Sequence, residues 1–291
     1  MPPTAKTLNL VGVGRVARTL GKLWHDAEVF VVHDVMARAR EHAQDAAAFI
    51  GAGRVVAALR DMHAADVWLI ATPDDAIASC AAALQASGLL RGNDVVFHCS
   101  GALPSTLLPG MHRASVHPLK SFANPADAAH SFSGTWCAAE GDAQALSVLK
   151  PAFTAIGAQV VDIDVNQKTF YHAASVLVCN KLTALMEAGL RCYEQAGLAR
   201  DTATRMMAPL VRETLENVFK LGTVKALTGP VARGDVAVVL RQLEALQGFD
   251  PRIAEVYRAL GQIAVELAGK QGVAAPQALA GAFDRSQETQ R

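Results

Sequence analysis

Three clusters of polar residues hold the side chains that could move protons in a reaction. His98 and Ser100 follow one short apolar run, and His117 ends another. Lys168 and His172 open a long helical pattern, four residues apart, so they share a helix face. When hydride is added to a carbonyl or an imine, a histidine or a lysine of lowered pKa can deliver the proton to the heteroatom. We therefore predict a proton relay of His117, Lys168 and His172, with Ser100 as a further catalytic candidate.

Three other polar residues are candidates for weaker reasons. Asn180 lies on the same predicted helix as His172, but helical spacing places it about 80° round the axis. Arg233 lies in a tight polar loop, residues 228–235, where its guanidinium could hold a substrate carboxylate. His98 is a second candidate for contact with substrate. A solvated turn for Arg233 and structural hydrogen bonds for each histidine are the alternative interpretations.

A glycine-rich turn near the start of the chain is typical of dinucleotide binding. Residues 12–17 read Gly-Val-Gly-Arg-Val-Ala, the GxGxxA form of the fingerprint, between an apolar run and a helical pattern. Gly12 permits the tight turn, Gly14 lets the backbone approach a pyrophosphate, and Ala17 lets the helix pack on the strand. The free N–H groups of the helix N-terminus would bind the phosphates. We predict NADP or NAD at this turn, with Arg15 and Val16 in the same loop.

Two residues compete for the adenosine ribose. Asp34 ends the second predicted strand, where a carboxylate would bond the ribose hydroxyls and favour NAD. Arg38 could instead bind a 2′-phosphate, and we favour NADP slightly. An aspartate facing that phosphate would repel it, so both cannot act directly.

The end of the fourth strand should lie beside the nicotinamide ribose. Thr72, Pro73 and Asp74 follow that strand, at the edge where ligands of open α/β sheets bind. The alternative for Asp74 is a helix cap.

The elements that must position these residues form two groups. Short continuous apolar runs alternate with helical patterns in the first half, which is typical of a parallel, doubly wound α/β sheet covered on both faces. The predicted strands are 8–13, 29–33, 55–59, 67–71, 95–99, 114–117, 136–139 and 159–163. Beyond residue 164 only helices are predicted, at 165–196, 201–221, 235–246 and 251–268. We therefore expect an NAD(P)-binding Rossmann-like domain at 1–164 and a helical substrate and dimerisation domain at 165–291.

Composition excludes several classes of function. The 27 basic and 27 acidic side chains cancel, so the chain lacks the field that nucleic acid or an anionic membrane needs. The five cysteines form no CxxC pair, which argues against a metal site and a disulfide framework. No apolar run approaches the roughly 20 residues of a membrane span, and Met1–Thr7 lacks a signal-peptide pattern. We expect a cytoplasmic protein.

Taken together, six motifs resemble one family. They are GVGRVA, ATPD, FHCSGAL, SVHPLKSF, KTFYHAAS with the following CN, and LTGPVARGD. The family joins a Rossmann-like domain to a C-terminal helical domain of unknown function, number 2520, and is grouped with NADP-dependent oxidoreductases. The resemblance extends over nearly the whole chain and implies the same fold and cofactor.

More remotely, the chain is similar to the 6-phosphogluconate, 3-hydroxyisobutyrate, ketopantoate, pyrroline-5-carboxylate and prephenate dehydrogenases and reductases. That group often dimerises through its helical part and sets a lysine or asparagine against the nicotinamide. Lys168 and Asn180 match by type but are further apart than in that group, and His172 takes the i+4 position. Ser100 and the His117-Pro118 pair resemble prephenate dehydrogenases. The resemblance implies a homodimer and these site residues.

The sequence thus predicts an NAD(P)-dependent oxidoreductase whose small, carboxylated substrate is held between the two domains. An alternative of another class is a catalytically silent NAD(P)-binding sensor or partner-binding protein. An alternative enzyme is a prephenate-type oxidative decarboxylase. The fingerprint serves the enzyme and the sensor equally. Convergence of the histidines and the lysine on the nicotinamide C4 position would distinguish them.

Overall fold

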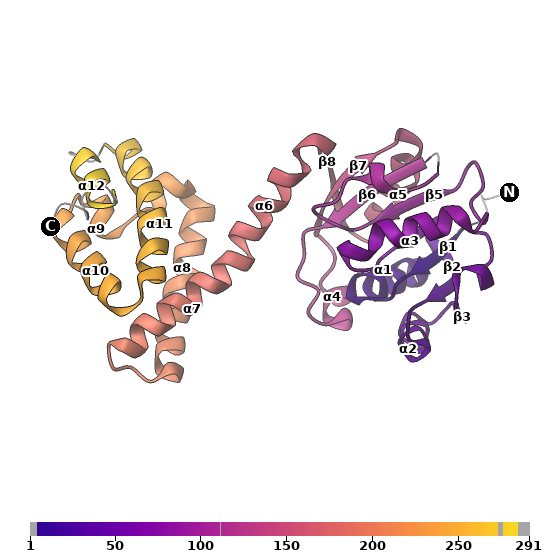
Figure 1. The fold of residues 1–291 in the computed structure, drawn as a ribbon, viewed down its shortest axis with the longest axis horizontal. Helices are drawn as coiled ribbons and strands as arrows, with labels where there is room; N and C mark the ends of the chain where they lie inside the picture. The colour runs from indigo at the N-terminus through magenta and orange to yellow at the C-terminus, as the bar shows by residue number, and fades with distance from the viewer. Residues whose placement is uncertain (1–4, 111, 273–275, 285–291) are drawn as a thin grey trace. The chain divides into compact units, whose positions relative to one another are not determined.

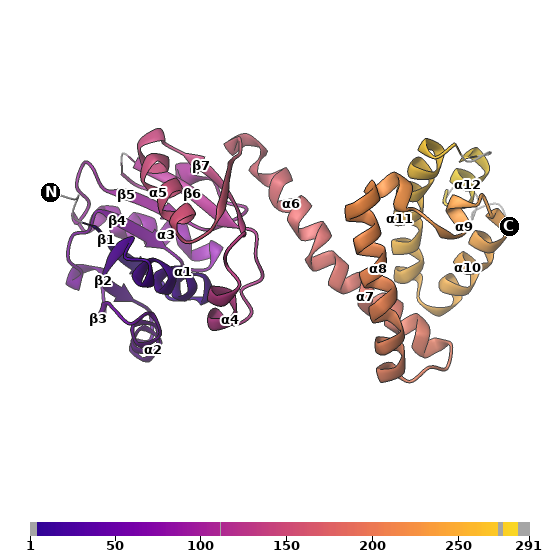
Figure 2. The same ribbon diagram turned by 180° about the vertical axis from the view of Figure 1, so that it is seen from behind.

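The computed structural model describes residues 5–110, 112–272 and 276–284, and Figures 1 and 2 show its fold from opposite sides. Contacts within the chain divide it into two compact units, Met1–Asn180 and Lys181–Arg291. The described part of the first unit contains the sheet, and that of the second contains only helices. The predicted boundary at residue 164 follows the last strand, and the first unit continues beyond it through one more helix.

The first unit is built on one sheet of eight strands, in the order β3-β2-β1-β4-β5-β6-β7-β8. The strands are β1 (Lys6–Val11), β2 (Phe30–Met36), β3 (Arg54–Val56), β4 (Val67–Ile70), β5 (Val95–His98), β6 (His112–Pro118), β7 (Trp136–Gly141) and β8 (Gln159–Asp162). The strand order reverses at β1, which is the topology of a doubly wound Rossmann sheet. The predicted fold class is confirmed.

One pair of strands departs from the predicted all-parallel sheet. β6 and β7 are antiparallel, whereas all the other neighbouring pairs are parallel. A parallel connection needs a crossover of a dozen or more residues that covers one face of the sheet, usually as a helix. The segment between β6 and β7 contains only the short helix α4 (Pro125–His130). Apolar runs have the same appearance in both directions, so the sequence did not show this reversal.

Helices cover both faces of the sheet. On one face the buried core includes Leu10, Trp24 and Phe153, and on the other it includes Trp68 and Ile77. The helices involved are α1 (Arg15–Asp26), α2 (Arg40–Ile50) and α5 (Ala143–Ala155) on the first face, and α3 (Asp74–Ala86) on the second. Burial on both faces explains why the strands have continuous apolar sequences.

The predicted long helix at 165–196 is interrupted. A short 3₁₀ turn (Val165–Gln167) precedes α6 (Lys168–Val178), and α7 (Asn180–Gln195) follows. Cys179 lies between them with φ −118° and ψ −70°. Because Cys179 is neither a glycine nor a proline, no helix-breaking residue in the sequence predicts this interruption.

The second unit consists of α7 and the helices that follow it. These are α8 (Arg200–Ala226), α9 (Gly229–Ala232), α10 (Val236–Phe249), α11 (Pro251–Lys270) and α12 (Pro276–Ala282). Asp235 and Asp250 cap α10 and α11 by accepting N–H bonds from Val238 and Arg252. Within α8, the residue with non-helical φ and ψ angles is Gly222.

One helical stretch of the described residues, Val165–Gln195, is long and apolar enough to cross a membrane by length and composition alone. The apolar runs in the sequence predicted no such stretch. Three of its side chains, Lys168, Tyr171 and His172, contact polar groups or ring atoms of the sheet unit. These contacts make the start of the stretch a structural part of the first unit.

Candidate active site

A cavity of about 700 Å³ opens at the carboxyl edge of β1, β2 and β4. Gly12 has φ +92°, and a Cβ there would lie 2.8 Å from the carbonyl of Ala71, so only glycine lets these two strand ends approach. A Cβ at Gly14 would meet only the Ala71 oxygen, at 3.8 Å, and the space in front of this turn stays open. The cavity is lined by residues 12–14, 18, 36–39, 42, 71–73, 76, 79 and 80.

The rest of the fingerprint serves packing or faces solvent. Ala17 is fully buried and Val16 packs against the same core, as the small third position of the motif requires. Arg15 is exposed and does not line the cavity. α1 begins after Gly14 without a side-chain cap, so its first N–H groups remain available to an anion.

Asp34 does not serve the ribose. Its side chain is fully buried, and Arg54 donates to both carboxylate oxygens at 2.8 and 3.0 Å while the His63 N–H donates to one of them. Burial by itself would raise the pKa of Asp34, but these hydrogen bonds outweigh it and hold the pKa below its usual value. This corrects the predicted NAD-type contact, because the carboxylate is fully buried and Asp34 does not line the cavity.

Arg38 and His42, and not Asp34, are the side chains that face the cavity near the end of β2. Arg38 and His42 both line it, and Arg18 joins them by donating to the His42 carbonyl at 3.2 Å. A planar guanidinium with free donors suits a phosphate, so the geometry favours the Arg38 alternative over Asp34.

Thr72 lines the cavity and has a hydroxyl group without a hydrogen-bond partner among the described residues. Its Oγ1 is buried without a hydrogen-bond partner, and Thr72 and Pro73 both line the cavity. A buried hydroxyl without a partner costs free energy that a bound ligand would recover. The residues present therefore fit a dinucleotide whose ribose or amide approaches Thr72.

Asp74 starts α3 but caps nothing through its side chain, since the N-cap residue is Pro73. The Ser100 hydroxyl donates to Asp74 Oδ2 at 2.8 Å and accepts the N–H groups of Ala102 and Leu103. Ser100 is thereby fixed next to the cofactor cavity, one strand beyond Thr72.

A second cluster lies one strand further along the same edge. β5 and β6 are parallel with His98 opposite Ser115, so His117 follows the edge past Ser100. His117 Nδ1 lies 2.8 Å from the Tyr171 hydroxyl, and the His117 and His172 rings are 6.0 Å apart.

Gly101 makes room for both imidazoles. A Cβ there would lie 2.5 Å from His172 Cδ2 and 2.9 Å from His117 Cε1. Burial, then the neighbouring His172 and the Lys168 charge, lower the pKa of His117 to about 4. His117 is therefore a neutral imidazole at pH 7.

Lys168 is buried in an ion pair with Glu140 and does not face the candidate site as predicted. Its ammonium is 2% exposed, donates to Glu140 Oε1 at 3.0 Å and bonds the Ser115 hydroxyl. Burial lowers the pKa of Lys168, and the ion pair with Glu140 opposes this shift. Lys168 therefore acts on His117 only through its charge, which corrects its predicted role as a proton-relay member.

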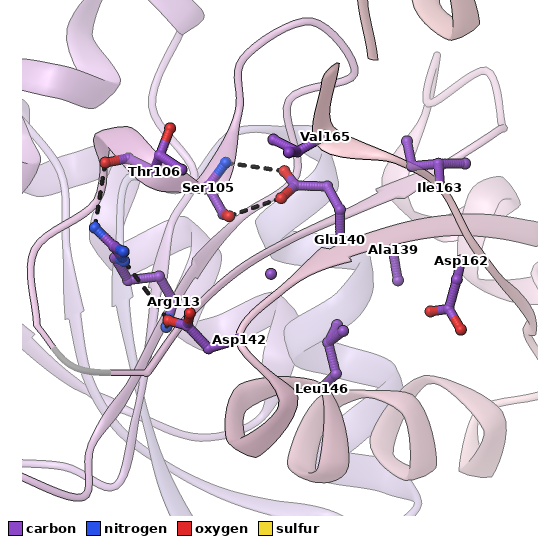
Figure 3. Close-up of a pocket in the computed structure, with 11 residues that line it drawn as sticks. Ser105, Thr106, Arg113, Ala139, Glu140, Asp142, Leu146, Asp162, Ile163 and Val165 are labelled. Carbon is purple, nitrogen blue, oxygen red and sulfur yellow. Dashed lines mark hydrogen bonds and ion pairs between the residues drawn. The ribbon is translucent and has the colours of Figure 1, made fainter. Parts of the chain in front are cut away.

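The carboxylate of Glu140 also accepts hydrogen bonds from Ser105. The Ser105 N–H and hydroxyl donate to its two oxygens at 2.8 and 2.7 Å, as Figure 3 shows. This carboxylate also lines a small cavity of about 360 Å³, in which Arg113 contacts Asp142. The Lys168–Glu140 pair, with its bonds to Ser105 and Ser115, ties α6 to the sheet.

His98 is also structural, which corrects its predicted contact with substrate. The residue is fully buried, Nδ1 accepts the Ser100 N–H at 3.1 Å, and Nε2 lies 3.3 Å from the Pro104 carbonyl. Since Nδ1 accepts, Nε2 carries the proton and donates to Pro104.

The remaining predicted residues are Asn180 and Arg233. Asn180 is exposed at the start of α7, and the helical rise puts its backbone roughly 12 Å beyond His172. Arg233 is exposed at the end of α9 in the helical unit, and its contact with a carboxylate remains a prediction. Among the described residues, no group of three or more His, Cys, Asp or Glu side chains could hold a metal ion.

Sequence reasoning missed the roles of Tyr171, Glu140, Ser115 and Gly101. Tyr171 and Gly101 lie inside recognised motifs, and the one-turn spacing of Tyr171 from Lys168 was the available signal. Nothing in the sequence links Glu140 to Lys168, because the two are 28 residues apart and meet only through the sheet.

Comparison with known proteins agrees with this fold. Residues 135–264 match the family described as a domain of unknown function (DUF2520), which confirms the resemblance found in the motifs. No match was found among curated proteins.

Three solved structures show the same architecture. Protein TM1727 from Thermotoga maritima is 26% identical, with 91% of this chain and 99% of that chain covered and a TM-score of 0.74. The putative NADP oxidoreductase BF3122 from Bacteroides fragilis is 22% identical, with coverages of 91% and 99% and a TM-score of 0.71. The Plasmodium falciparum pyrroline carboxylate reductase with NADP bound is 11% identical, with coverages of 97% and 99% and a TM-score of 0.58.

The buried ion pair predicts a large effect on stability. Glu140→Ala leaves the Lys168 ammonium buried and uncompensated, so the free energy of unfolding should fall by about 3–5 kcal/mol. Asp162→Ala, which removes an exposed partner of Lys150, should cost less than about 1 kcal/mol and serves as the control. Urea unfolding of both variants measures the difference, and similar losses would contradict the structural role.

Stability should also depend on pH through His98. Burial first, and the Lys168 charge second, lower its pKa to about 4 from an ordinary 6.5. The unfolded chain therefore takes up the proton first, and stability falls as pH falls from about 6.5 toward 4. Between pH 7 and 5 the loss should be about 2 kcal/mol. Urea unfolding of His98→Gln should show a smaller pH dependence than the native chain, and an equal one would contradict the assignment.

Proposed function

We propose that this protein is an NADP-dependent oxidoreductase that transfers hydride between the nicotinamide and a carbonyl or imine carbon of a small substrate. One observation carries the proposal. A cavity of about 700 Å³ lies at the glycine turn, and Ser100 and His117 lie at the ends of the next two strands along the same sheet edge. Ligands of doubly wound sheets bind at this edge, so the cofactor and the polar groups would meet there.

Arg38 and His42 support NADP over NAD. Both lie at the part of the cavity next to the end of β2, where the adenosine ribose binds in Rossmann domains. The carboxylate that would select NAD is occupied by Arg54 and His63. A 2′-phosphate would therefore meet a guanidinium and no free carboxylate.

In the reaction, the cofactor would supply the hydride. The His117 imidazole is the side chain that could bond the heteroatom of the substrate, whereas the Ser100 hydroxyl already donates to Asp74 and accepts from Ala102 and Leu103. The names of structural relatives support this proposal, since one is a pyrroline carboxylate reductase with NADP bound and another is a prephenate dehydrogenase bound to NAD+. His117, with a neutral ring, would donate a hydrogen bond and then the proton.

The silent sensor and the prephenate-type decarboxylase remain the alternatives. The Tyr171–His117 pair favours an enzyme, because a sensor needs no oriented donor beside the cofactor. A carboxylated substrate, with Arg233 as its partner, is part of this proposal.

We also propose that the chain works as a homodimer through its helical unit. An apolar groove of about 570 Å³ lies among α7, α8, α10 and α11, and Leu210 and Leu260 in it are about half exposed. Exposed apolar patches of this kind mark interaction surfaces. The five free cysteines suit a reducing compartment, and we place the protein in the cytoplasm.

Cofactor choice tests the proposed function. Arg38→Ala should weaken NADPH binding by about 1.5–3 kcal/mol, the loss expected for a hydrogen bond to a charged group, and leave NADH almost unchanged. Arg40→Ala, exposed on α2 but outside the cavity, is the matched control. Fluorescence titration measures both affinities. Equal losses for the two cofactors, or no binding of either one by the native chain, would count against the proposal.

The molecular mass in solution tests the proposed homodimer. Light scattering at micromolar concentration should give about twice the 30.6 kDa of one chain. Leu260→Glu should bring the mass down toward one chain, because a charge in the groove is costly to bury. Val31→Glu, exposed on the sheet unit, should leave the mass unchanged. A native mass of one chain would exclude this surface as a dimer interface.

A further inference from the structure

We propose that Tyr171 is a positioning residue that holds His117 in the tautomer with its proton on Nε2, the nitrogen available to a substrate. This inference rests on the proposed function, because it names the residue that prepares the proton donor. The two side chains meet directly, with the Tyr171 hydroxyl 2.8 Å from Nδ1 and the ring planes at 85°.

The position of Tyr171 is set by the element that carries it. Lys168, three residues earlier on α6, is fixed by its buried ion pair with Glu140. Residues three apart on a helix lie on neighbouring parts of one face. The ion pair therefore holds the phenol against His117, and the back-bond from the Ser175 hydroxyl to the Tyr171 carbonyl lies on the same helix.

The direction of the hydrogen bond follows from the chemistry of the two groups. A neutral imidazole has one nitrogen that donates and one that accepts. A phenol is a stronger acid than an imidazole N–H, and an imidazole nitrogen is a far better base than a phenol oxygen. The bond therefore runs from the Tyr171 O–H to Nδ1 of His117, which places the ring proton on Nε2.

The surrounding groups keep both rings in these forms at neutral pH. Burial raises the pKa of Tyr171, so the phenol keeps its proton. Burial, His172 and Lys168 lower the pKa of His117, and Asp74 opposes them more weakly. His117 is thus neutral, with a single N–H.

Nε2 of His117 lies beside Gly101. A Cβ at Gly101 would lie 3.0 Å from Nε2 and 2.5 Å from His172 Cδ2, so the absence of a side chain lets both rings lie here. Among the described residues, no hydrogen bond is made by Nε2, in contrast with Nδ1. A substrate heteroatom could accept from Nε2–H here.

The protons and the hydride can be accounted for in the proposed step. Hydride, with both electrons, forms the new C–H bond while the heteroatom takes the Nε2 proton. The phenol proton of Tyr171 moves to Nδ1, so His117 stays neutral. To restore the starting forms, the Nδ1 proton would return to the Tyr171 oxygen and a proton from solvent would bind Nε2.

The tautomer can be measured without cofactor or substrate. In the full chain labelled with ¹⁵N-histidine, two-bond proton–nitrogen spectra at pH 7 should show His117 protonated on Nε2, with the signal assigned from a His117→Gln spectrum. Tyr171→Phe should shift the tautomer ratio toward Nδ1–H by about fivefold, the effect of one ordinary hydrogen bond. Tyr257→Phe, which removes a hydroxyl bonded to Gln242 in the helical unit, should leave it unchanged.

Two results would overturn the inference: a native His117 protonated on Nδ1, or a ratio that Tyr171→Phe does not alter. If that variant does not fold, the native spectrum alone decides. The spectra involve no NADPH, so their outcome is separate from the Arg38 titration that tests the proposed function.

Discussion

A buried ion pair between Lys168 and Glu140 determines where the second half of the candidate site can be. It ties the start of α6 to the sheet at a point where neither charge reaches solvent. Moving two charges out of water costs several kcal/mol each, and two apolar side chains would pack there without that cost. The pair also gives α6 one register, because the ammonium must meet the carboxylate. That register brings Tyr171 and His172 to His117.

The sheet supplies the other half by placing chemically different groups in a row. The parallel pairing of β1, β4, β5 and β6 brings their carboxyl ends to one edge, about 4.8 Å apart from strand to strand. Gly12, Thr72, Ser100 and His117 follow one another along it. The first two line the proposed cofactor cavity, and His117 carries the imidazole that could bond a substrate. Binding and chemistry therefore depend on the same strand order.

The sequence predicted what depends on local pattern. Apolar runs and the glycine turn predicted the Rossmann sheet. It did not predict partners that meet through the fold. Asp34 has the right type and position for a ribose but is paired with Arg54, 20 residues away. Lys168 has the right type for a proton donor but is buried against Glu140. Type and spacing cannot show whether a charged group already has a partner.

The central claim is that cofactor and His117 share one edge of the sheet. A crystal structure of the full chain with NADP+ tests it most directly. The account predicts the 2′-phosphate on Arg38, the pyrophosphate at Gly14, and the nicotinamide C4 facing the same space as His117 Nε2, within the reach of one substrate. A nicotinamide bound away from His117, or a dinucleotide bound outside this cavity, would contradict it.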